Sequence, residues 1–514
     1  MTGSKNIYRP SQTVQKASKT NIGKLFESKA KLIPEATAII EYDNKTTYGE
    51  LNARANQLAN GLIEKGLEHG DRIAIISRNS TAYLELELAC AKTGIILVGI
   101  NWRLAKEEVR HCLDLTQPKL IFATIEFQEV LPNSEKMENI LFHTEYENLI
   151  GNSPNKEPDF NVDGEDGLVI IFTSGTTGLP KGALISHRAL ITRALIFTAE
   201  TSAPKNDTFI AWSPLFHMGS NDFSIATLIH GGQVVIIDGY DPKEMIKTIE
   251  TYPVHYLTVV PGMIEDFINQ LKAAKAKPKP IGLIGAMADL VPKPLLKEIT
   301  NLLDAPYWNT FGSTETGNPP ASANLIAIGT APEELPKQQN NFCEIRLVDP
   351  DDNDVEDGKP GELAIRGPSL FSGYWANEKA NEESFRNGWF HMGDVFRRTP
   401  EGLLEFVDRV KYMIKSGGEN IYPAEIEKHI MADERVVDVA VVRKPDERWG
   451  EVPVAFVACN TDDIKNSDII ELCRNRIANY KLPKEVHFMK SDNMPRTHSG
   501  KIQRHILEQR LSDS

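Results

Sequence analysis

The chain has 514 residues, which is too long for one ordinary hydrophobic core, so two or more domains are expected. With 41% hydrophobic and 25% charged residues, its composition is that of an average globular protein and indicates neither disorder nor a fibrous repeat. Acidic residues outnumber basic residues by 71 to 57, and the net charge of −14 argues against general binding to nucleic acid or to anionic membranes.

The sequence predicts neither export nor an integral membrane segment. The first twenty residues are polar and basic and lack the apolar stretch of a signal peptide, so we expect an irregular start, although a transit peptide stays open. The longest apolar runs, such as 94–100, are far shorter than a bilayer crossing. The five cysteines are scattered and predict reduced, mostly buried thiols, so a cytoplasmic location is expected.

Apolar periodicity predicts helices and strands that alternate along the chain. Thr47 and Glu50 form a capping-box pattern that opens a helix over 47–66. This alternation is typical of an α/β architecture. The other elements that it predicts are a helix over 81–92 and strands over 72–76, 95–100, 168–172, 233–237 and 256–261.

Beyond residue 409 the pattern changes to a compact module. It contains a glycine-rich turn, a helix opened by Pro423 and strands over 436–443 and 452–459. We therefore predict an α/β protein with a large multi-layer domain over 1–409 and a small α+β domain over 410–514.

Ten consecutive residues, 173–182, directly follow the apolar strand 168–172 and form the most informative motif. Three glycines let the backbone wrap an anion, four hydroxyls supply donors, and a lysine supplies charge, which together suit a polyphosphate. The spacing is not that of a Walker loop, and a flexible polar turn is the alternative. The candidate nucleotide-binding residues are Thr173, Ser174, Gly175, Thr176, Thr177, Gly178 and Lys181.

This motif resembles the signature loop of the adenylate-forming (ANL) superfamily, which includes acyl-CoA synthetases, luciferases and the adenylation domains of peptide synthetases. The resemblance runs from residue 47 to residue 501 and implies an acid:CoA ligase that uses ATP, Mg²⁺ and coenzyme A. Such an enzyme converts a carboxylic acid to its acyl-adenylate with release of pyrophosphate, then forms the thioester with release of AMP. It also implies that the small domain is mobile about a hinge near Lys411; a homodimer is left open.

The second motif, 309–315, sets an aromatic ring and a glycine beside a hydroxyl and a carboxylate, a combination suited to a base, a phosphate and a cation. By resemblance Phe311 stacks on adenine, Thr314 binds the α-phosphate and Glu315 holds magnesium, together with Thr176. Many relatives have glycine where this chain has Thr310, so the acyl pocket is expected to be narrower. The resemblance also assigns three other positions to the nucleotide: Asn309, Thr310 and Gly312.

Three later motifs complete the implied nucleotide site. Asp394 and Arg409 match a ribose-binding pair, for which a structural salt bridge is the alternative. Lys415 and Asn420 match positions that touch the adenylate, and Lys501 matches the catalytic lysine. The implied coenzyme A contacts are Ser416, Gly417, Gly418 and Trp449.

The acyl pocket is the least legible part of the sequence. Residues 214–219 and 285–287 resemble the segments that border the acyl and adenine sites in the family. A histidine such as His217 is as often a hydrogen-bonded core residue as a functional one. The overall pattern favours a medium- or long-chain fatty acid, with an aromatic acid of the coumarate, ferulate or benzoate type second. Delivery of the acyl group to a carrier protein, or a silent binding module, are the rival functions. The candidate residues are His217, Met218, Gly219 and Met287 for the acid, and Gly285 and Ala286 for the nucleotide.

Overall fold

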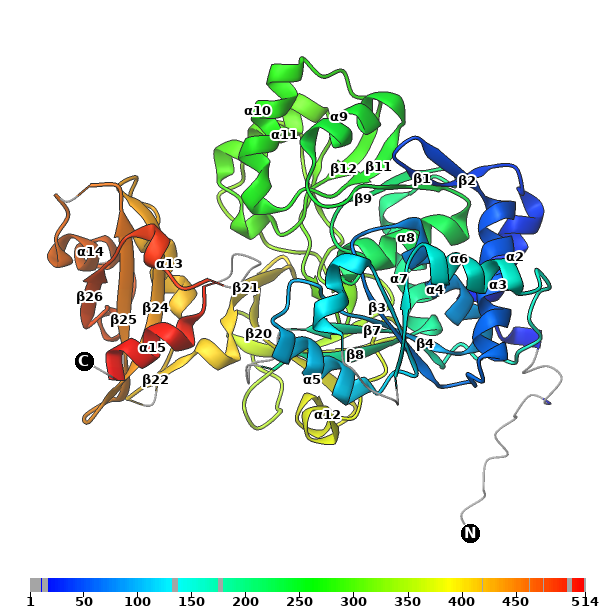
Figure 1. The fold of residues 1–514 in the computed structure, drawn as a ribbon. Coiled ribbons are helices and arrows are strands. Elements are labelled where there is room, and N and C mark those ends of the chain that lie inside the picture. Colours follow the sequence, from blue (N-terminus) through cyan, green and yellow to red (C-terminus); the bar gives the residue numbers. More distant parts are fainter. Residues whose placement is uncertain are drawn as a thin grey trace, which may run out of the picture. The chain divides into compact units, whose positions relative to one another are not determined.

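The computed structural model describes residues 11, 17–131, 137–173, 179–417, 419–461, 463–474, 476–496 and 502–512. The chain divides into a large unit, Met1–Cys343 with Gly367–Glu383, and a small unit, Glu344–Arg366 with Ser384–Ser514 (Figure 1). The predicted fold class, mixed α/β with a large N-terminal and a small C-terminal part, is confirmed. The border predicted at 409 and 410 falls inside the small unit and stays a prediction.

A six-stranded sheet in the order β6-β5-β3-β4-β7-β8 forms one layer of the large unit. All neighbours are parallel except β7 and β8, which form an antiparallel hairpin. The middle strands are buried along nearly their whole length, as the continuous apolar runs predict. The bounds are β3 (Arg72–Ile76), β4 (Ile96–Gly99), β5 (Leu120–Ala123), β6 (Glu138–Leu141), β7 (Gly167–Thr173) and β8 (Lys181–Ser186).

Two four-stranded sheets, in the orders β2-β1-β10-β9 and β11-β12-β13-β16, and a short hairpin of β14 and β15 complete the strands of this unit. Their carboxyl ends carry several of the candidate site residues. The bounds are β1 (Thr37–Glu41), β2 (Asn44–Thr47), β9 (Thr208–Ala211), β10 (Gln233–Ile236), β11 (Val254–Leu257), β12 (Ile281–Ile284), β13 (Tyr307–Trp308), β14 (Gly312–Ser313), β15 (Gly317–Pro320) and β16 (Leu325–Ile326).

Helices cover these sheets, and several of them begin at a residue whose side chain caps the first turn. Thr47 accepts from the backbone of Glu50 and Glu50 accepts from the backbone of Thr47, so the predicted capping box is confirmed. The bounds are α2 (Ile22–Leu32), α3 (Tyr48–Glu64), α4 (Thr81–Thr93), α5 (Lys106–Thr116), α6 (Thr144–Asn152), α7 (His187–Thr201), α8 (Met218–His230), α9 (Pro242–Thr251), α10 (Ile264–Ala274), α11 (Lys293–Leu303) and α12 (Glu378–Ser384).

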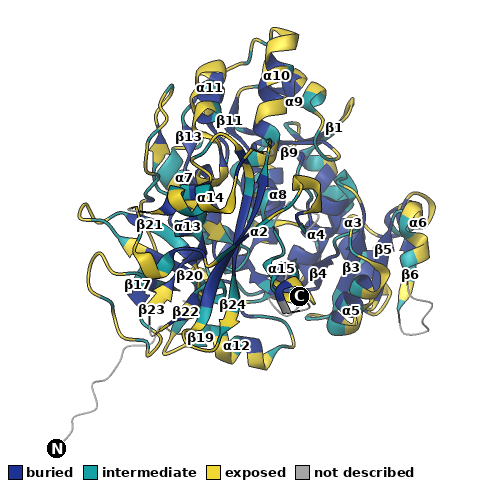
Figure 2. Cartoon of the chain, turned by 90° about the vertical axis from the view of Figure 1, so that its left-hand side faces the viewer, coloured by how far each residue is buried: buried dark blue, intermediate teal, exposed yellow. Residues whose placement is uncertain are grey.

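One hydrophobic core lies between α9, α10 and α11 and the strands β11 and β12, which Figure 1 shows together. Met245, Phe267 and Leu296 supply the helix side of this core and are fully buried. Figure 2 shows the pattern, with buried strands and with exposed residues on the outward sides of α10 and α11. This core fixes the end of β12, from which residues 285–287 leave.

The small unit contains two sheets, β17-β18-β20-β19 with β21 beside β20, and β23-β22-β25-β24 with β26 beside β25. Neighbouring strands are antiparallel except β25 and β26, which are parallel. Helix α13 packs on β24 and on α14, so apolar residues of all three share a core. The bounds are β17 (Glu344–Val348), β18 (Gly361–Arg366), β19 (Phe385–Arg386), β20 (Trp389–Arg398), β21 (Leu404–Arg409), β22 (Ile414–Ser416), β23 (Glu419–Ile421), α13 (Pro423–Ile430), β24 (Val436–Asp446), β25 (Gly450–Cys459), α14 (Asn466–Cys473), β26 (Glu485–Phe488) and α15 (Arg504–Ser512).

Two predictions about the whole chain can be compared with the described residues. No described helix combines the length and the apolar character that a membrane crossing needs. All five cysteines are free thiols, and Cys90, Cys112 and Cys473 are buried.

Helix α4 buries an unusual carboxyl group. The side chain of Glu87 is fully buried, and it accepts one hydrogen bond at 2.7 Å from the amide of Asn221. Burial raises the pKa of Glu87 to about 8, and the nearby Asp222 carboxylate adds to the rise. Glu87 is therefore mainly protonated in the native state at neutral pH.

This raised pKa predicts how stability changes with pH. Between the ordinary value of 4.5 and about 8, the folded chain binds a proton that the unfolded chain has lost, so stability falls as pH rises through this window. Glu87→Gln cannot ionise, so its Tm should fall less than that of the wild type between about pH 5 and about pH 8.5. Thermal unfolding at several pH values measures the difference, and equal slopes would show that Glu87 is not a neutral buried acid.

Candidate active site

The hairpin of β7 and β8 carries the first predicted site residues of the large unit. Thr173, the last residue of β7, is in register with Lys181, the first residue of β8. The ammonium of Lys181 lies 5.1 Å from the centroid of the Tyr374 ring, which is a cation–π distance. The two ends of the predicted phosphate loop therefore lie side by side. The remaining loop residues, Ser174, Gly175, Thr176, Thr177 and Gly178, lie outside the described residues.

The carboxylate of Glu315 lies against the same tyrosine. The hydroxyl of Tyr374 donates to Oε1 of Glu315 at 2.8 Å, and the backbone N–H of Phe371 donates to the carbonyl of Glu315 at 2.8 Å. Lys181 and Glu315 come from motifs far apart in the sequence, and both contact Tyr374. The structure thus brings these two predicted site residues together through a residue that no motif singled out.

A buried guanidinium holds the residue before Glu315. Arg193, on α7, donates to the carbonyls of Thr314 at 3.1 Å and Ser369 at 3.0 Å, and it forms an ion pair at 2.9 Å with Asp222 on α8. The two charged side chains are 3% and 8% exposed. Burial raises the pKa of Asp222, although the Arg193 guanidinium opposes the rise. A polar network in the core therefore fixes the backbone of Thr314.

A second buried cation fixes the start of the 309–315 motif. The ammonium of Lys337 is completely buried; it donates to Oδ1 of Asn309 at 2.6 Å and pairs with Asp289 at 2.6 Å. Burial lowers the pKa of Lys337, while the Asp289 carboxylate acts in the opposite direction. Asn309 also donates to the carbonyls of Leu335 and Pro336, both at 3.2 Å. Asn309 is thus locked by its own neighbours, so its observed contacts are structural.

Residues 285–287 lie beside this motif, as expected. Gly285 has φ +81°, and a Cβ there would lie 2.1 Å from the ring of Tyr307, so only glycine fits. The hydroxyl of Tyr307 donates to the carbonyl of Ala286 at 2.7 Å. The backbone N–H of Met287 donates to the hydroxyl of Thr310 at 3.0 Å. The candidate adenine and acyl residues of these two segments therefore meet at the carboxyl ends of β12 and β13.

The third candidate segment enters helix α8. His217 caps this helix, and its Nδ1 accepts from the backbone N–H of Gly219 at 3.1 Å. Asn79 holds the preceding turn, because it accepts from the N–H of Leu215 and donates to the carbonyl of Ser213, both at 2.8 Å. His217 is exposed and is not a core histidine, whereas Met218 and Gly219 are partly buried.

Four aromatic side chains, Phe197, Phe223, Tyr256 and Trp308, form a wall behind residues 285–287. The Tyr256 ring centroid lies 4.8 Å from that of Phe223 and 5.0 Å from that of Trp308. Phe197 lies 5.1 Å from Phe223 in an edge-on arrangement. The hydroxyl of Tyr256 donates to the carbonyl of Gly285 at 3.1 Å. This aromatic wall therefore begins directly at a candidate site residue.

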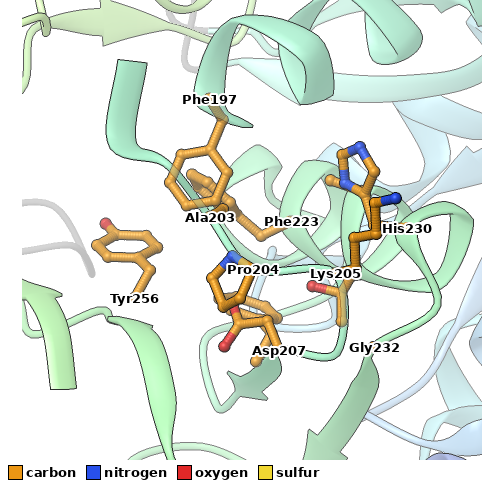
Figure 3. Close-up of a pocket in the computed structure, with 12 residues that line it drawn as sticks. Phe197, Ala203, Pro204, Lys205, Asp207, Phe223, His230, Gly232 and Tyr256 are labelled. Atoms are coloured by element: carbon orange, nitrogen blue, oxygen red, sulfur yellow. The ribbon is translucent and has the colours of Figure 1, made fainter. Parts of the chain in front are cut away.

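A surface pocket adjoins the aromatic wall (Figure 3). Phe197, Phe223 and Tyr256 line it, together with Lys205 and His230 among others. Figure 3 shows the rings of Phe197 and Phe223 beside each other at this pocket. Tyr256 thus lines the pocket and also contacts Gly285 with its hydroxyl.

The small unit holds the candidate ribose residues. Asp394 on β20 and Arg409 on β21 are in register, and their side chains form an ion pair at 3.0 Å. The neighbouring Asp408 is buried, accepts from the backbone N–H of Ala424 at 2.7 Å, and has a pKa raised by that burial. The ammonium of Lys411 lies 4.7 Å from the centroid of the Tyr412 ring.

The candidate coenzyme A residues also lie in this unit. Lys415 and Asn420 pair across β22 and β23, and both are exposed. Gly417 has φ +60° and donates to the carbonyl of Trp449 at 2.8 Å; a Cβ on Gly417 would lie 2.8 Å from that indole ring. Ser416 pairs with Gly450, the residue after Trp449, so Ser416, Gly417 and Trp449 lie next to one another. Gly418 and Lys501 lie outside the described residues.

Tyr374, Arg193 and Lys337 are the site-supporting residues that the sequence analysis missed. The sequence does contain a signal for the ion pair of Arg193 and Asp222, because both are charged residues in the interiors of largely apolar helices. Tyr374 and Lys337 lie in segments without regular periodicity, so no local pattern indicates their contacts.

Comparison with known proteins finds matches over nearly the whole chain. A family model for AMP-binding enzymes matches residues 26–375, and a model for the AMP-binding enzyme C-terminal domain matches residues 425–501. Feruloyl-CoA synthase of Amycolatopsis sp is 32% identical over 480 residues, covering 92% of this chain and 96% of that relative. Indoleacetate–CoA ligase of Aromatoleum aromaticum is 34% identical over 500 residues, covering 93% and 96%.

Two solved structures have a similar fold. Fatty acyl CoA synthetase of Mycobacterium tuberculosis is 28% identical with a TM-score of 0.78, covering 96% of this chain and 98% of that chain. The o-succinylbenzoate CoA synthetase of Bacillus subtilis, solved in complex with its acyl-adenylate intermediate, is 25% identical with a TM-score of 0.81 and the same coverage.

The buried pair of Arg193 and Asp222 makes a prediction about stability. Arg193→Met or Asp222→Leu alone should lower the free energy of unfolding by about 3–5 kcal/mol, because the partner is left as an unpaired buried charge. The double variant should lose clearly less than the sum. Urea unfolding of the full chain measures the coupling, and Lys247→Met, in an exposed pair with Glu244, should cost less than about 1 kcal/mol. Additive losses would contradict the coupling.

Proposed function

Because the chain belongs to the family of AMP-binding enzymes, we propose that it joins a compact, ring-bearing carboxylic acid to coenzyme A. The chain is an AMP-forming acyl-CoA ligase that uses ATP and coenzyme A. In the first step an oxygen of the acid attacks the α-phosphorus of ATP, and pyrophosphate leaves with the electrons of the broken bond. In the second step the thiolate of coenzyme A attacks the acyl carbon, and AMP leaves.

The first step must bring two anions together, so positive groups have to neutralise them. Lys181 would neutralise the departing pyrophosphate, and its position at the start of β8, at one end of the candidate phosphate loop, supports this role. Lys501 would bridge the acid and the α-phosphate, and Thr314 would donate to the same phosphate. A preorganised donor of this kind is typically worth about 3–4 kcal/mol of the barrier.

Glu315 suits a magnesium ion. Magnesium takes hard oxygen ligands and typically binds through one or two carboxylates together with substrate phosphates. Tyr374 holds Oε1 of Glu315, while Oε2 receives no hydrogen bond from the part of the chain that the structure describes. Thr176 and the phosphates would supply further ligands. There magnesium would neutralise phosphate charge.

Candidate residues for the nucleoside occur in each unit. Phe311 would stack on adenine near Gly285 and Ala286, and Asp394 would accept from the ribose hydroxyls. The ion pair with Arg409 supports this role, because it fixes the position of the Asp394 carboxylate.

The second step needs a different set of contacts. Gly417, Gly418 and Trp449 would line the path of the pantetheine thiol, and the direct contact between Gly417 and Trp449 supports a common surface. We propose that residues 410–514 turn about Lys411 between the two steps, so that Lys501 serves the first step and the glycines serve the second. Lys415 and Asn420 would contact the adenylate.

The aromatic wall carries the proposal about the acid. Tyr256 bonds to Gly285 at the candidate site, and its ring is packed against Phe223 and Trp308. We infer that these rings would limit the length of an acid bound next to Gly285. A ring-sized acid can end against this wall. Relatives named for ferulate, indoleacetate and succinylbenzoate agree with such an acid. A medium- or long-chain fatty acid, which the sequence pattern favours, is the second candidate, and the Mycobacterium tuberculosis fatty acyl CoA synthetase supports it.

A panel of acids tests this function. In an assay of AMP release that requires coenzyme A, ferulate, coumarate, indoleacetate and succinylbenzoate should include the best substrate, with kcat/KM at least about tenfold above octanoate and dodecanoate. Better turnover of the fatty acids would overturn the ring-bearing acid while leaving the ligase in place. Adenylate formation without any acyl-CoA would instead indicate a carrier protein as acceptor.

Opening the aromatic wall should change the choice of acid. Phe223→Ala removes the ring between Tyr256 and Phe197 and should join the site to the pocket of Figure 3. We expect the ratio of kcat/KM for dodecanoate to that for the best aromatic acid to rise about tenfold or more.

Phe142→Ala is the matched control for this variant. Phe142 is a buried ring in a separate aromatic cluster with Phe122 and Tyr146, so its loss should cost a similar stability, about 3–5 kcal/mol, without changing the ratio. An unchanged ratio in Phe223→Ala would show that the wall does not limit the acid.

A further inference from the structure

The side chain of Tyr374 contacts both Lys181 and Glu315. Its hydroxyl donates to Oε1 of Glu315 at 2.8 Å, and its ring lies 5.1 Å from the ammonium of Lys181. Both partners belong to the proposed polyphosphate site, whereas no motif of the sequence includes Tyr374 itself.

The backbone around Tyr374 is tied to the strand that Lys181 begins. The N–H of Trp375 donates to the carbonyl of Gly182 at 2.7 Å, and the N–H of Leu184 donates to the carbonyl of Gly373 at 3.0 Å. Ala183 and Tyr374 form an antiparallel bridge between these bonds. Residues 373–375 therefore act as a short extra strand beside β8, and the position of Tyr374 relative to Lys181 is fixed by the backbone.

The other end of this segment is tied to Glu315. The N–H of Phe371 donates to the carbonyl of Glu315 at 2.8 Å, and the Phe371 ring packs edge-on against Tyr374 with centroids 4.9 Å apart. Asn381 closes the segment, because it accepts from the N–H of Tyr374 at 2.7 Å and donates to its carbonyl at 2.9 Å. Tyr374 is thus anchored to the two chain segments that carry the opposite charges.

These opposite charges do not pair with each other. Lys181 and Glu315 are both described, and no ion pair joins them. The Lys181 ammonium lies over the Tyr374 ring instead, and one carboxylate oxygen of Glu315 accepts a hydrogen bond from the Tyr374 hydroxyl. A direct ion pair would neutralise both groups and would compete with phosphate for Lys181 and with a cation for Glu315. A phenol avoids this competition, since it is neutral and offers a π-face and an O–H at different places.

We propose that Tyr374 is a positioning residue that holds the Glu315 carboxylate ready for a divalent cation and keeps the Lys181 ammonium apart for phosphate. The inference rests on the proposed function, because it assigns Glu315 to the cation that accompanies ATP. The hydroxyl acts on cation binding and the ring acts on phosphate binding, so the two parts of one side chain have separable effects.

Two substitutions separate these parts. Tyr374→Phe keeps the ring beside Lys181 and removes the hydrogen bond to Glu315. We expect the Mg²⁺ concentration for half-maximal ATP–pyrophosphate exchange to rise about tenfold, with kcat at saturating Mg²⁺ and the KM for ATP nearly unchanged. Tyr374→Leu removes the ring as well, so the KM for ATP should also rise several-fold.

A binding measurement gives a readout that does not depend on turnover. Calorimetric titration with a non-hydrolysable ATP analogue at low and high Mg²⁺ should show weaker binding by Tyr374→Phe only at low Mg²⁺. In a Glu315→Gln background the same substitution should have no further effect, because the carboxylate on which the hydroxyl acts is gone.

Tyr240→Phe is the matched control. Tyr240 donates to a carboxylate oxygen of Asp266 at 2.8 Å elsewhere in the large unit, so this variant removes the same kind of bond and should leave the Mg²⁺ dependence unchanged. The proposal is overturned if Tyr374→Phe has the wild-type Mg²⁺ dependence, or if it lowers kcat and Tm equally at all Mg²⁺ concentrations. Absence of exchange with every acid would count against the ligase function, while the titration would still test Tyr374.

Discussion

The candidate site depends on one constraint: the backbone of Thr314 and Glu315 is held from both sides by residues far away in the sequence. Arg193 donates to the carbonyl of Thr314, and the N–H of Phe371 donates to the carbonyl of Glu315. Two adjacent carbonyls are therefore bound, one by a side chain of helix α7 and the other by the backbone of Phe371. With its backbone fixed in this way, the Glu315 side chain needs only one further contact, from Tyr374, to have a defined direction.

Buried charges provide much of this fixation, and their physical cost indicates why they occur where they do. Removing an ion pair from water costs more than a surface pair returns, so hydrophobic residues of similar shape would often give equal or greater stability. The pair of Arg193 and Asp222 is nevertheless buried, and so is the ammonium of Lys337, although its partner Asp289 is exposed. Both cations bond to residues of the 309–315 motif, Arg193 to Thr314 and Lys337 to Asn309. A guanidinium and an ammonium can donate to backbone and amide oxygens, which aliphatic side chains cannot. Here buried charge serves the orientation of a loop.

Much of the fold could be predicted from the sequence because its signals are local. The capping box at Thr47 begins helix α3, and the apolar run 168–172 lies within β7. The proximity of residues 285–287 to Thr310 could be expected only from the resemblance, and the structure describes it as a backbone-to-hydroxyl bond. The contacts of Tyr374 and Lys337 could not be predicted, since hydrogen bonds between distant segments leave no periodicity. The loop residues 174–178 and Lys501 stay predictions, because they lie outside the described residues.

The polyphosphate-binding part of the candidate site is easier to predict from the sequence than the acyl-binding part, for a physical reason. A polyphosphate is recognised by backbone groups, hydroxyls and a lysine, and these must be close together along the chain to wrap a compact anion, so they form contiguous motifs. An acyl group is recognised by shape. The aromatic wall takes Phe197 from α7, Phe223 from α8, and Tyr256 and Trp308 from two strands of another sheet. In the proposed function, a change in any one of these elements would alter the depth of the acyl space without touching a motif. Relatives named for ferulate and for indoleacetate are both about one-third identical to this chain.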